Sequence, residues 1–196
     1  MDTTLSYRDA TRARLRDSLV SAARDLAVAH GWDKVRMADV ARAAGVSRQT
    51  VYNEFEGRTG LAEALAVREI EQFTSTVRTL LLDHGADVRA AGYAAISYTL
   101  TEAARNPLIR SILTSARGGA DELLPYLTTR SGLVLAAARA VIEEWAAAHL
   151  PGTDAAVVAV AGESVVRLTV SHIVLPTGSP EDAATALAEV FVRLLR

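Results

Sequence analysis

The stretch AAGVSRQTVYNEF, residues 43–55, gathers five side chains that can hydrogen-bond to nucleic acid. They are Arg48, Gln49, Thr50, Tyr52 and Asn53. On a helix that starts at Ser47 they point outward near the N-terminus, where free backbone N–H groups also favour an anion. Such side chains reach base edges and phosphate oxygens in the major groove of DNA. The pattern therefore predicts a helix that contacts DNA.

The role expected of each side chain follows from its donor and acceptor geometry. Gln49 and Asn53 are suited to adenine and Arg48 to guanine, although the sequence leaves open which bases they meet. Tyr52 is better suited to a phosphate, and Arg58, at the start of the next helix, is a second candidate for a backbone contact. An ordinary exposed helix would account for the polarity, but not for the spacing of the residues before it.

Those preceding residues have the spacing of a helix-turn-helix. Ala41 is small where a second helix must approach closely, and Gly45 can adopt the left-handed conformation that ends the first helix. Ser47 can cap the second helix, and we also include it among the DNA-facing residues. The side chains expected to pack inward are Val46, Val51 and Phe55.

The segment GWDKVRMADVARAAGVSRQTVYNEFEGRTGLAEAL resembles the N-terminal domain of TetR-family transcriptional repressors. The shared features are Gly31 with a following aromatic residue, Val40-Ala41, Ala44-Gly45-Val46-Ser47, Thr50-Val51-Tyr52, Phe55 and Leu61. The resemblance covers about residues 15–65 and implies a homodimer of chains with about nine or ten helices. It also implies an N-terminal DNA-binding domain and a C-terminal ligand-binding and dimerisation domain. By the same resemblance, Thr50, Tyr52 and Arg58 match positions that usually touch DNA.

Three positions depart from the family pattern. Arg36 stands where a threonine usually caps a helix, so we expect that cap to be weaker or supplied otherwise. Glu54 replaces a common His or Tyr, and Glu56 replaces a common Pro or Lys. Both carboxylates would lie near phosphate and repel it, so neither is expected to contact DNA. They keep a second hypothesis open, in which a helical ligand-binding or interaction protein retains the helix-turn-helix only as a scaffold.

The whole chain is predicted to be all-α, because no stretch shows the sustained alternation of a strand. Helices are expected at about residues 9–30, 37–45, 48–55, 59–82, 88–105, 107–113, 133–149, 154–174 and 180–195. Residues 115–132 form the least regular segment, with two adjacent glycines and a proline. We expect a DNA-binding domain over residues 1–57 and a ligand-binding and dimerisation domain over residues 58–196.

Aromatic and polar residues of the second domain are candidates for the wall of a small-molecule pocket. The residues expected to bind ligand are Tyr93, Tyr98, Tyr126, Trp145, Glu163, Arg167 and His172, with Ile96, Leu100, Ile112 and Leu113 as apolar neighbours. Taken singly, each aromatic or apolar residue is better explained as part of a core than as a ligand contact, and the hypothesis is stronger for the group than for its members. Glu163 and Arg167 can also pair along one helix, so an ion pair, a dimer contact and a pocket role all stay open.

A dimer interface is expected on the last two long helices. The last helix carries an apolar stripe of Leu187, Val190, Phe191 and Leu194. This stripe can join the helix at residues 154–174 in a four-helix interface across a two-fold axis. The alternative is that the stripe packs only on its own core, but two helix-turn-helix units one DNA turn apart require a dimer.

Two further segments, DELLPYLTTRSG and VRLTVSHIVLPTGSPED, resemble a TetR subgroup that represses genes for the degradation of quorum-signal lactones. That resemblance implies an acyl- or lactone-type effector. The combined hypothesis is a ligand-responsive regulator, released from its DNA operator by a small apolar or lactone-like molecule.

Composition and short motifs argue against several other kinds of protein, including metalloproteins, enzymes and membrane proteins. The 196 residues include no cysteine, which excludes disulfides and thiolate zinc sites, and the four histidines lack metal-ligand spacing, so we expect neither metal nor cofactor. The sequence GESVV has Val166 where a nucleophile elbow needs glycine, and no enzymatic activity is expected. The net charge is −2, yet residues 1–60 hold ten Lys and Arg against eight Asp and Glu. Without a signal peptide or an uninterrupted apolar span, the protein is expected to be cytoplasmic.

Overall fold

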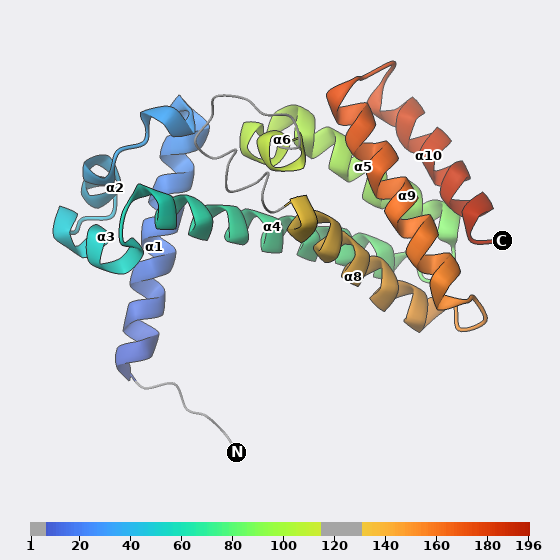
Figure 1. Cartoon of the computed structure of the whole chain (residues 1–196), viewed down its shortest axis with the longest axis horizontal. Coiled ribbons are helices and arrows are strands. Elements are labelled where there is room, and N and C mark those ends of the chain that lie inside the picture. Colours follow the sequence, from blue (N-terminus) through green and yellow to red (C-terminus); the bar gives the residue numbers. More distant parts are fainter. Residues whose placement is uncertain (1–6, 115–130) are drawn as a thin grey trace. The chain divides into compact units, whose positions relative to one another are not determined.

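The computed structural model describes residues 7–114 and 131–196, and every regular element in these ranges is a helix (Figure 1). The prediction of an all-α chain is thus confirmed. Two compact units can be distinguished, one formed by residues 7–68 and the other by residues 69–114 and 131–196. The division falls within α4 (Arg58–Asp83), which contributes residues to both units.

The first unit is built around one long helix and two short ones. It contains α1 (Tyr7–His30), the 3-10 helix η1 (Trp32–Lys34), α2 (Met37–Ala43), α3 (Arg48–Phe55) and the first turns of α4. In Figure 1 α2 and α3 are the short successive helices beside α1. Apolar side chains from all of these elements are buried, among them Leu19, Val40, Val51, Leu61 and Leu65. The core therefore ties α3 to α1, α2 and α4.

The second unit is a bundle of longer helices. After the rest of α4 come α5 (Val88–Arg105), α6 (Pro107–Thr114), α8 (Ser131–His149), α9 (Ala155–Val174) and α10 (Pro180–Leu194). Helices α5 and α10 pack against each other, and α9 packs against α5, α6, α8 and α10. Trp145 and Phe191 are almost fully buried, with their ring centroids 6.0 Å apart.

Side-chain caps fix where several of these helices begin. As predicted, Asp154 caps α9 by accepting from the Ala156 N–H at 2.7 Å. Ser179 caps α10 by accepting from the Asp182 N–H at 3.1 Å, with Pro180 in the first turn. Each cap satisfies a backbone donor that the helix itself leaves unpaired. Of the segment predicted to be least regular, residues 115–130 lie outside the described residues.

Helix α9 has two different sides. By length and composition alone it is apolar enough to cross a membrane, but Ala161, Val165 and Thr169 on it are buried within the bundle. The opposite side exposes Val160 by 64%, Leu168 by 39% and Val157 by 37%. A helix that buries one apolar side in its own unit and exposes a second has a surface available for a partner.

Candidate functional site

The turn between α2 and α3 has the geometry that its sequence predicts. Gly45 has φ 69°, in the left-handed region that favours glycine, and it ends α2. The next residue, Val46, donates its N–H to the Ala41 carbonyl at 2.9 Å. Ser47 then caps α3, because its Oγ accepts the Thr50 N–H at 3.1 Å. At the other end of α2, Arg36 makes no side-chain cap, as its departure from the family pattern predicted.

The inner side of α3 holds the helix in the first unit. Val51 is completely buried and Phe55 is 4% exposed, which confirms two of the three predicted inward contacts. Val46 is only half-buried, because it lies in the turn before the helix. The helix is therefore anchored along one side and through its C-terminal residue.

The outer side of α3 brings the predicted polar residues together in two pairs. Arg48 Nη2 donates to Tyr52 Oη at 3.2 Å, with the guanidinium carbon 5.2 Å from the ring centroid. Gln49 Nε2 donates to Asn53 Oδ1 at 2.8 Å. All four side chains are exposed and lie one helical turn from their partners, as side chains four residues apart do. Thr50 is half-buried, and its hydroxyl lies 2.8 Å from Ser47 Oγ.

This exposed face is rich in hydrogen-bonding groups and carries one fixed positive charge. The hydrogen bond to Tyr52 raises the pKa of Arg48 above its ordinary value, and an arginine guanidinium is charged at any physiological pH. Amide, hydroxyl and guanidinium groups on one exposed helix face can hydrogen-bond to base edges and phosphate oxygens in a DNA groove. The two intrahelical pairs hold these side chains in fixed positions along the helix surface.

Arg58 lies apart from this face. Its Nη2 donates to the Trp32 carbonyl at 2.6 Å, and its guanidinium carbon lies 5.2 Å from the centre of the Trp32 ring. The side chain is half-buried and connects the first turn of α4 to η1. The sequence predicted that Arg58 contacts the phosphate backbone of DNA, whereas in the structure its guanidinium contacts Trp32.

Glu54 has an arrangement that the sequence did not predict. Its carboxylate is bound by two arginines of α1, with Arg12 Nε 3.0 Å from Oε2 and Arg16 Nη1 3.0 Å from Oε1. The Glu54 side chain is only 9% exposed. The sequence predicted that this carboxylate repels phosphate, but in the structure two positive charges oppose its single negative charge. Glu56, by contrast, is exposed and ends α3 with φ 58°.

The second unit contains a cavity of about 90 Å³ between its helices. Residues of α4, α5, α6, α8, α9 and α10 line it, all from the second unit and nearly all apolar. The polar side chains among its described walls are Thr74, Thr99 and Thr169. Each donates its hydroxyl to a carbonyl of its own helix, at 2.7, 2.8 and 2.8 Å respectively. The described wall therefore presents hydrocarbon and carries no charged group.

The residues predicted to bind ligand are scattered over the second unit. Of the apolar neighbours, Ile96 lines the cavity, but none of the described ligand candidates does. Tyr98 lies one layer behind the wall, stacked on the wall residue Phe73 at 5.4 Å between centroids. Trp145 is a core residue, whose Nε1 donates to the Gly85 carbonyl at 2.8 Å. Tyr126 lies outside the described residues.

The remaining four candidates, which are Tyr93, Glu163, Arg167 and His172, are not among the residues that line this cavity. Tyr93 is 38% exposed, so its ring faces outward from α5. Glu163 and Arg167 form an exposed pair along α9, with Arg167 Nη2 2.7 Å from Glu163 Oε1. His172 lines a separate hollow beside the start of α10. For the three candidates on α9, helical periodicity could not show which side of the helix lines the cavity, because α9 has apolar residues on two sides.

Half of the predicted dimer stripe on α10 is core. Leu187 is 4% exposed and Phe191 is 2% exposed, and Phe191 also lines the cavity. Because they are buried within their own chain, they are not available to a partner, and this part of the prediction needs correction. Leu194 is 38% exposed and Val190 is half-buried.

Within the part of the chain that the structure describes, no group of three His, Asp or Glu side chains is placed to hold a metal ion.

Comparisons with known proteins cover both units. Residues 19–65 match a family model described as bacterial regulatory proteins, tetR family. Residues 87–193 match one described as bacterial tetracyclin repressor, C-terminal domain. Among individual relatives, the HTH-type transcriptional regulator AlkX of Mycobacterium tuberculosis is 35% identical over 191 residues, covering 95% of this chain and 87% of that protein.

Solved structures agree with these matches. The TetR-family repressor AlkX from Dietzia sp., implicated in the biodegradation of n-alkanes, is 31% identical, with a TM-score of 0.69 over 91% of this chain and 94% of the other. A TetR-family regulator from Mesorhizobium loti is 17% identical, with a TM-score of 0.68 over 93% of this chain and 97% of that one. At this lower identity, the second likeness shows the fold alone.

Proposed function

Because the chain belongs to the TetR family of bacterial transcriptional regulators, we propose that it is a repressor that is released from operator DNA by an apolar effector. The observation that carries the proposal is the outer face of α3, where two exposed pairs of hydrogen-bonding side chains stand on a helix anchored from behind. We assign DNA binding to a domain of residues 1–57, and ligand binding and dimerisation to a domain of residues 58–196.

The proposed DNA contacts come from the start of α3. They are Ser47, Arg48, Gln49, Thr50, Tyr52 and Asn53. Arg48 and Tyr52 supply a charge and a hydroxyl to the phosphate backbone or to guanine, and the amides of Gln49 and Asn53 suit adenine. We omit Arg58 from the contacts, since its guanidinium is hydrogen-bonded to Trp32.

A salt titration of DNA binding tests this function. We expect the wild-type protein to bind the DNA upstream of its own gene and to lose affinity steeply as salt rises, because phosphate contacts release counterions. Arg48→Ala should weaken binding and reduce the slope of log K against log salt by about one. Arg139→Ala removes an exposed charge in the second unit and serves as the matched control. Salt-insensitive binding, unchanged by Arg48→Ala, would favour a helix-turn-helix retained only as scaffold.

The cavity of the second unit is the proposed effector site. Its described wall is hydrocarbon, and its three threonine hydroxyls already donate to backbone carbonyls. Such a wall suits an uncharged aliphatic chain better than the polar ring of a lactone, since an unpaired polar group loses its hydrogen bonds on burial. The Dietzia relative, implicated in the biodegradation of n-alkanes, supports the same chemical class. An apolar cavity of 150 Å³ can hold benzene, so this smaller one must widen for a longer chain.

Ligand-dependent melting separates the two effector classes. We expect aliphatic hydrocarbons to raise the melting temperature and to release DNA, whereas acyl lactones should act more weakly. Ala138→Phe fills the cavity from α8 and should abolish the shift. Ala140→Phe, at an exposed position of the same helix, is the matched control. A larger shift with lactones would instead support the lactone-type effector.

The exposed side of α9 is the proposed dimer surface. Val157, Val160 and Leu168 recur at helical spacing beside the Glu163–Arg167 pair, and exposed Leu194 adds to the apolar surface on α10. A two-fold axis through this surface would give the isologous contact of a homodimer, which positions two copies of α3 on DNA. An apolar α9 buried in this way fits a soluble, cytoplasmic protein rather than a membrane span.

A further inference from the structure

Glu54 links the DNA-facing helix to α1 through three contacts. Its two carboxylate oxygens are each 3.0 Å from an arginine nitrogen, of Arg12 and Arg16. Arg16 Nη1 also donates to the Glu54 carbonyl at 3.3 Å, and its guanidinium carbon lies 4.6 Å from the centroid of the Phe55 ring. The carboxylate, the backbone and the neighbouring ring at the end of α3 are all held by the same face of α1.

The position of Glu54 makes these contacts matter for the outer face of α3. It follows Tyr52 and Asn53 directly, so the rotation of α3 about its axis that satisfies the Glu54 contacts also sets where those two side chains point. A carboxylate bound by two guanidiniums has a narrow range of favourable geometries. Losing it would leave α3 held by Val51 and Phe55, whose apolar contacts are less directional.

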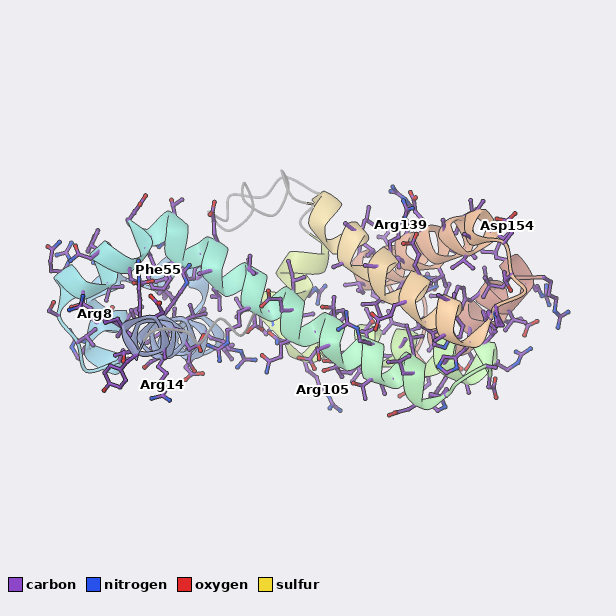
Figure 2. All side chains as sticks on the ribbon, turned by 90° about the horizontal axis from the view of Figure 1, so that it is seen from below. Arg8, Arg14, Phe55, Arg105, Arg139 and Asp154 are labelled. Carbon is purple, nitrogen blue, oxygen red and sulfur yellow. The ribbon has the colours of Figure 1, made fainter. Side chains whose placement is uncertain are left out.

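The same contacts restrain two positive charges. Arg12 and Arg16 keep side-chain exposures of 68% and 45%, and Arg8 and Arg14 are exposed on the same helix (Figure 2). Free guanidiniums beside a DNA-facing helix would bind phosphates of any sequence. Bound to Glu54, Arg12 and Arg16 each have a guanidinium nitrogen on the carboxylate and their charges opposed by it, which weakens phosphate contacts that carry no sequence information.

We propose that Glu54 determines the DNA specificity of this protein without contacting a base, by fixing the orientation of α3 and by holding Arg12 and Arg16 against it. Glu54 is thus a positioning residue. The inference rests on the proposed function of α3 in binding DNA. The inference gives Glu54 a part in DNA binding, although the sequence alone predicted that its carboxylate would repel phosphate.

The test compares binding to operator DNA with binding to a scrambled duplex of the same length and composition. In Glu54→Gln, the amide cannot neutralise the two arginines. We expect affinity for the scrambled duplex to rise, its salt slope to steepen by about two as two guanidiniums become free, and the ratio of operator to scrambled affinity to fall about tenfold or more. Glu56→Gln makes the same change of charge at an exposed position two residues on. It should raise both affinities alike and preserve the ratio.

Arg12→Gln keeps the test available if Glu54→Gln folds poorly, because Arg12 is 68% exposed and its loss removes only one of the contacts. Because this variant loosens α3 but also removes one of the two guanidiniums, we expect weaker operator binding, no gain in affinity for the scrambled duplex, and a smaller fall of the affinity ratio than in Glu54→Gln. A purely structural role for Glu54 would lower the melting temperature while leaving the ratio unchanged, and that result would overturn the inference. An equal fall of the ratio in Glu56→Gln would overturn it too. A wild type without selectivity would overturn the proposed function and this inference together.

Discussion

Gly60 lies in the first turn of α4, next to the C-terminal end of α3. The close approach of these two segments requires a residue without a side chain at this position. A Cβ atom built on Gly60 would lie 2.1 Å from the Phe55 carbonyl oxygen and 3.1 Å from the Phe55 carbonyl carbon. Ordinary contacts of a Cβ begin near 3.4 Å, and the opposing atom is backbone, which cannot rotate away. Gly60→Ala must therefore separate the two segments by about 1.3 Å, displacing the end of α3 from α4.

Two effects of opposite sign set the magnitude. Alanine favours the helical conformation over glycine by about 1 kcal/mol. Overpacking against a backbone atom costs about 1–3 kcal/mol, and the upper end applies because no side chain can yield. The net loss is about 1–2 kcal/mol, which for a chain of this size lowers the melting temperature by about 2–8 °C. Because α3 moves with Phe55, operator affinity should fall as well.

Thermal unfolding with a matched substitution provides the assay. Gly152 has no neighbouring atom within 4 Å of its hypothetical Cβ, so Gly152→Ala should stay within about 0.5 kcal/mol of the wild type. If Gly60→Ala melts at or above the wild-type temperature and binds operator equally well, the close approach of α4 to Phe55 is not what holds α3.

Three further predictions concern the cap, the dimer surface and pH. Ser47→Ala removes the cap of α3 and should cost about 1 kcal/mol in urea unfolding, while Ser47→Asp should restore most of it. Val160→Glu places a charge on the exposed face of α9 and should convert the proposed dimer to monomers in sedimentation, whereas a dimer that survives would contradict that interface. Hydrogen bonds from Arg89 and then Arg193 lower the pKa of Glu189 below its ordinary 4.5. The stability this gives is complete above that ordinary value and is lost as pH falls through the lowered one, so melting curves of Glu189→Gln and the wild type should differ at neutral pH and converge in acid.

Local sequence was sufficient to predict α3 and its surroundings. The left-handed Gly45, the Ser47 cap and the burial of Val51 and Phe55 depend on residues within a few positions of one another, which is the range that turn and cap chemistry covers. Helix starts at Asp154 and Ser179 were predictable for the same reason.

The contacts that could not be predicted join residues far apart in the chain. Glu54 is bound by arginines about forty positions earlier, so the sequence shows a carboxylate beside DNA-facing residues but not the charges that oppose it. The stripe on α10 has two possible partners, its own bundle or a second chain. Periodicity identifies an apolar side without saying which partner covers it, and in the structure Leu187 and Phe191 are covered by their own chain.

Contact between the outer face of α3 and DNA can be measured directly, because the chain contains no cysteine. Gln49→Cys places a single thiol on that face, and Ala186→Cys places one at an exposed position of α10 as a control. We predict that operator DNA slows alkylation of the thiol at position 49 by about tenfold or more, an effect that high salt reverses, while the thiol at position 186 reacts at an unchanged rate. Equal alkylation of the thiol at position 49 with and without saturating operator DNA would mean that the outer face of α3 does not contact DNA.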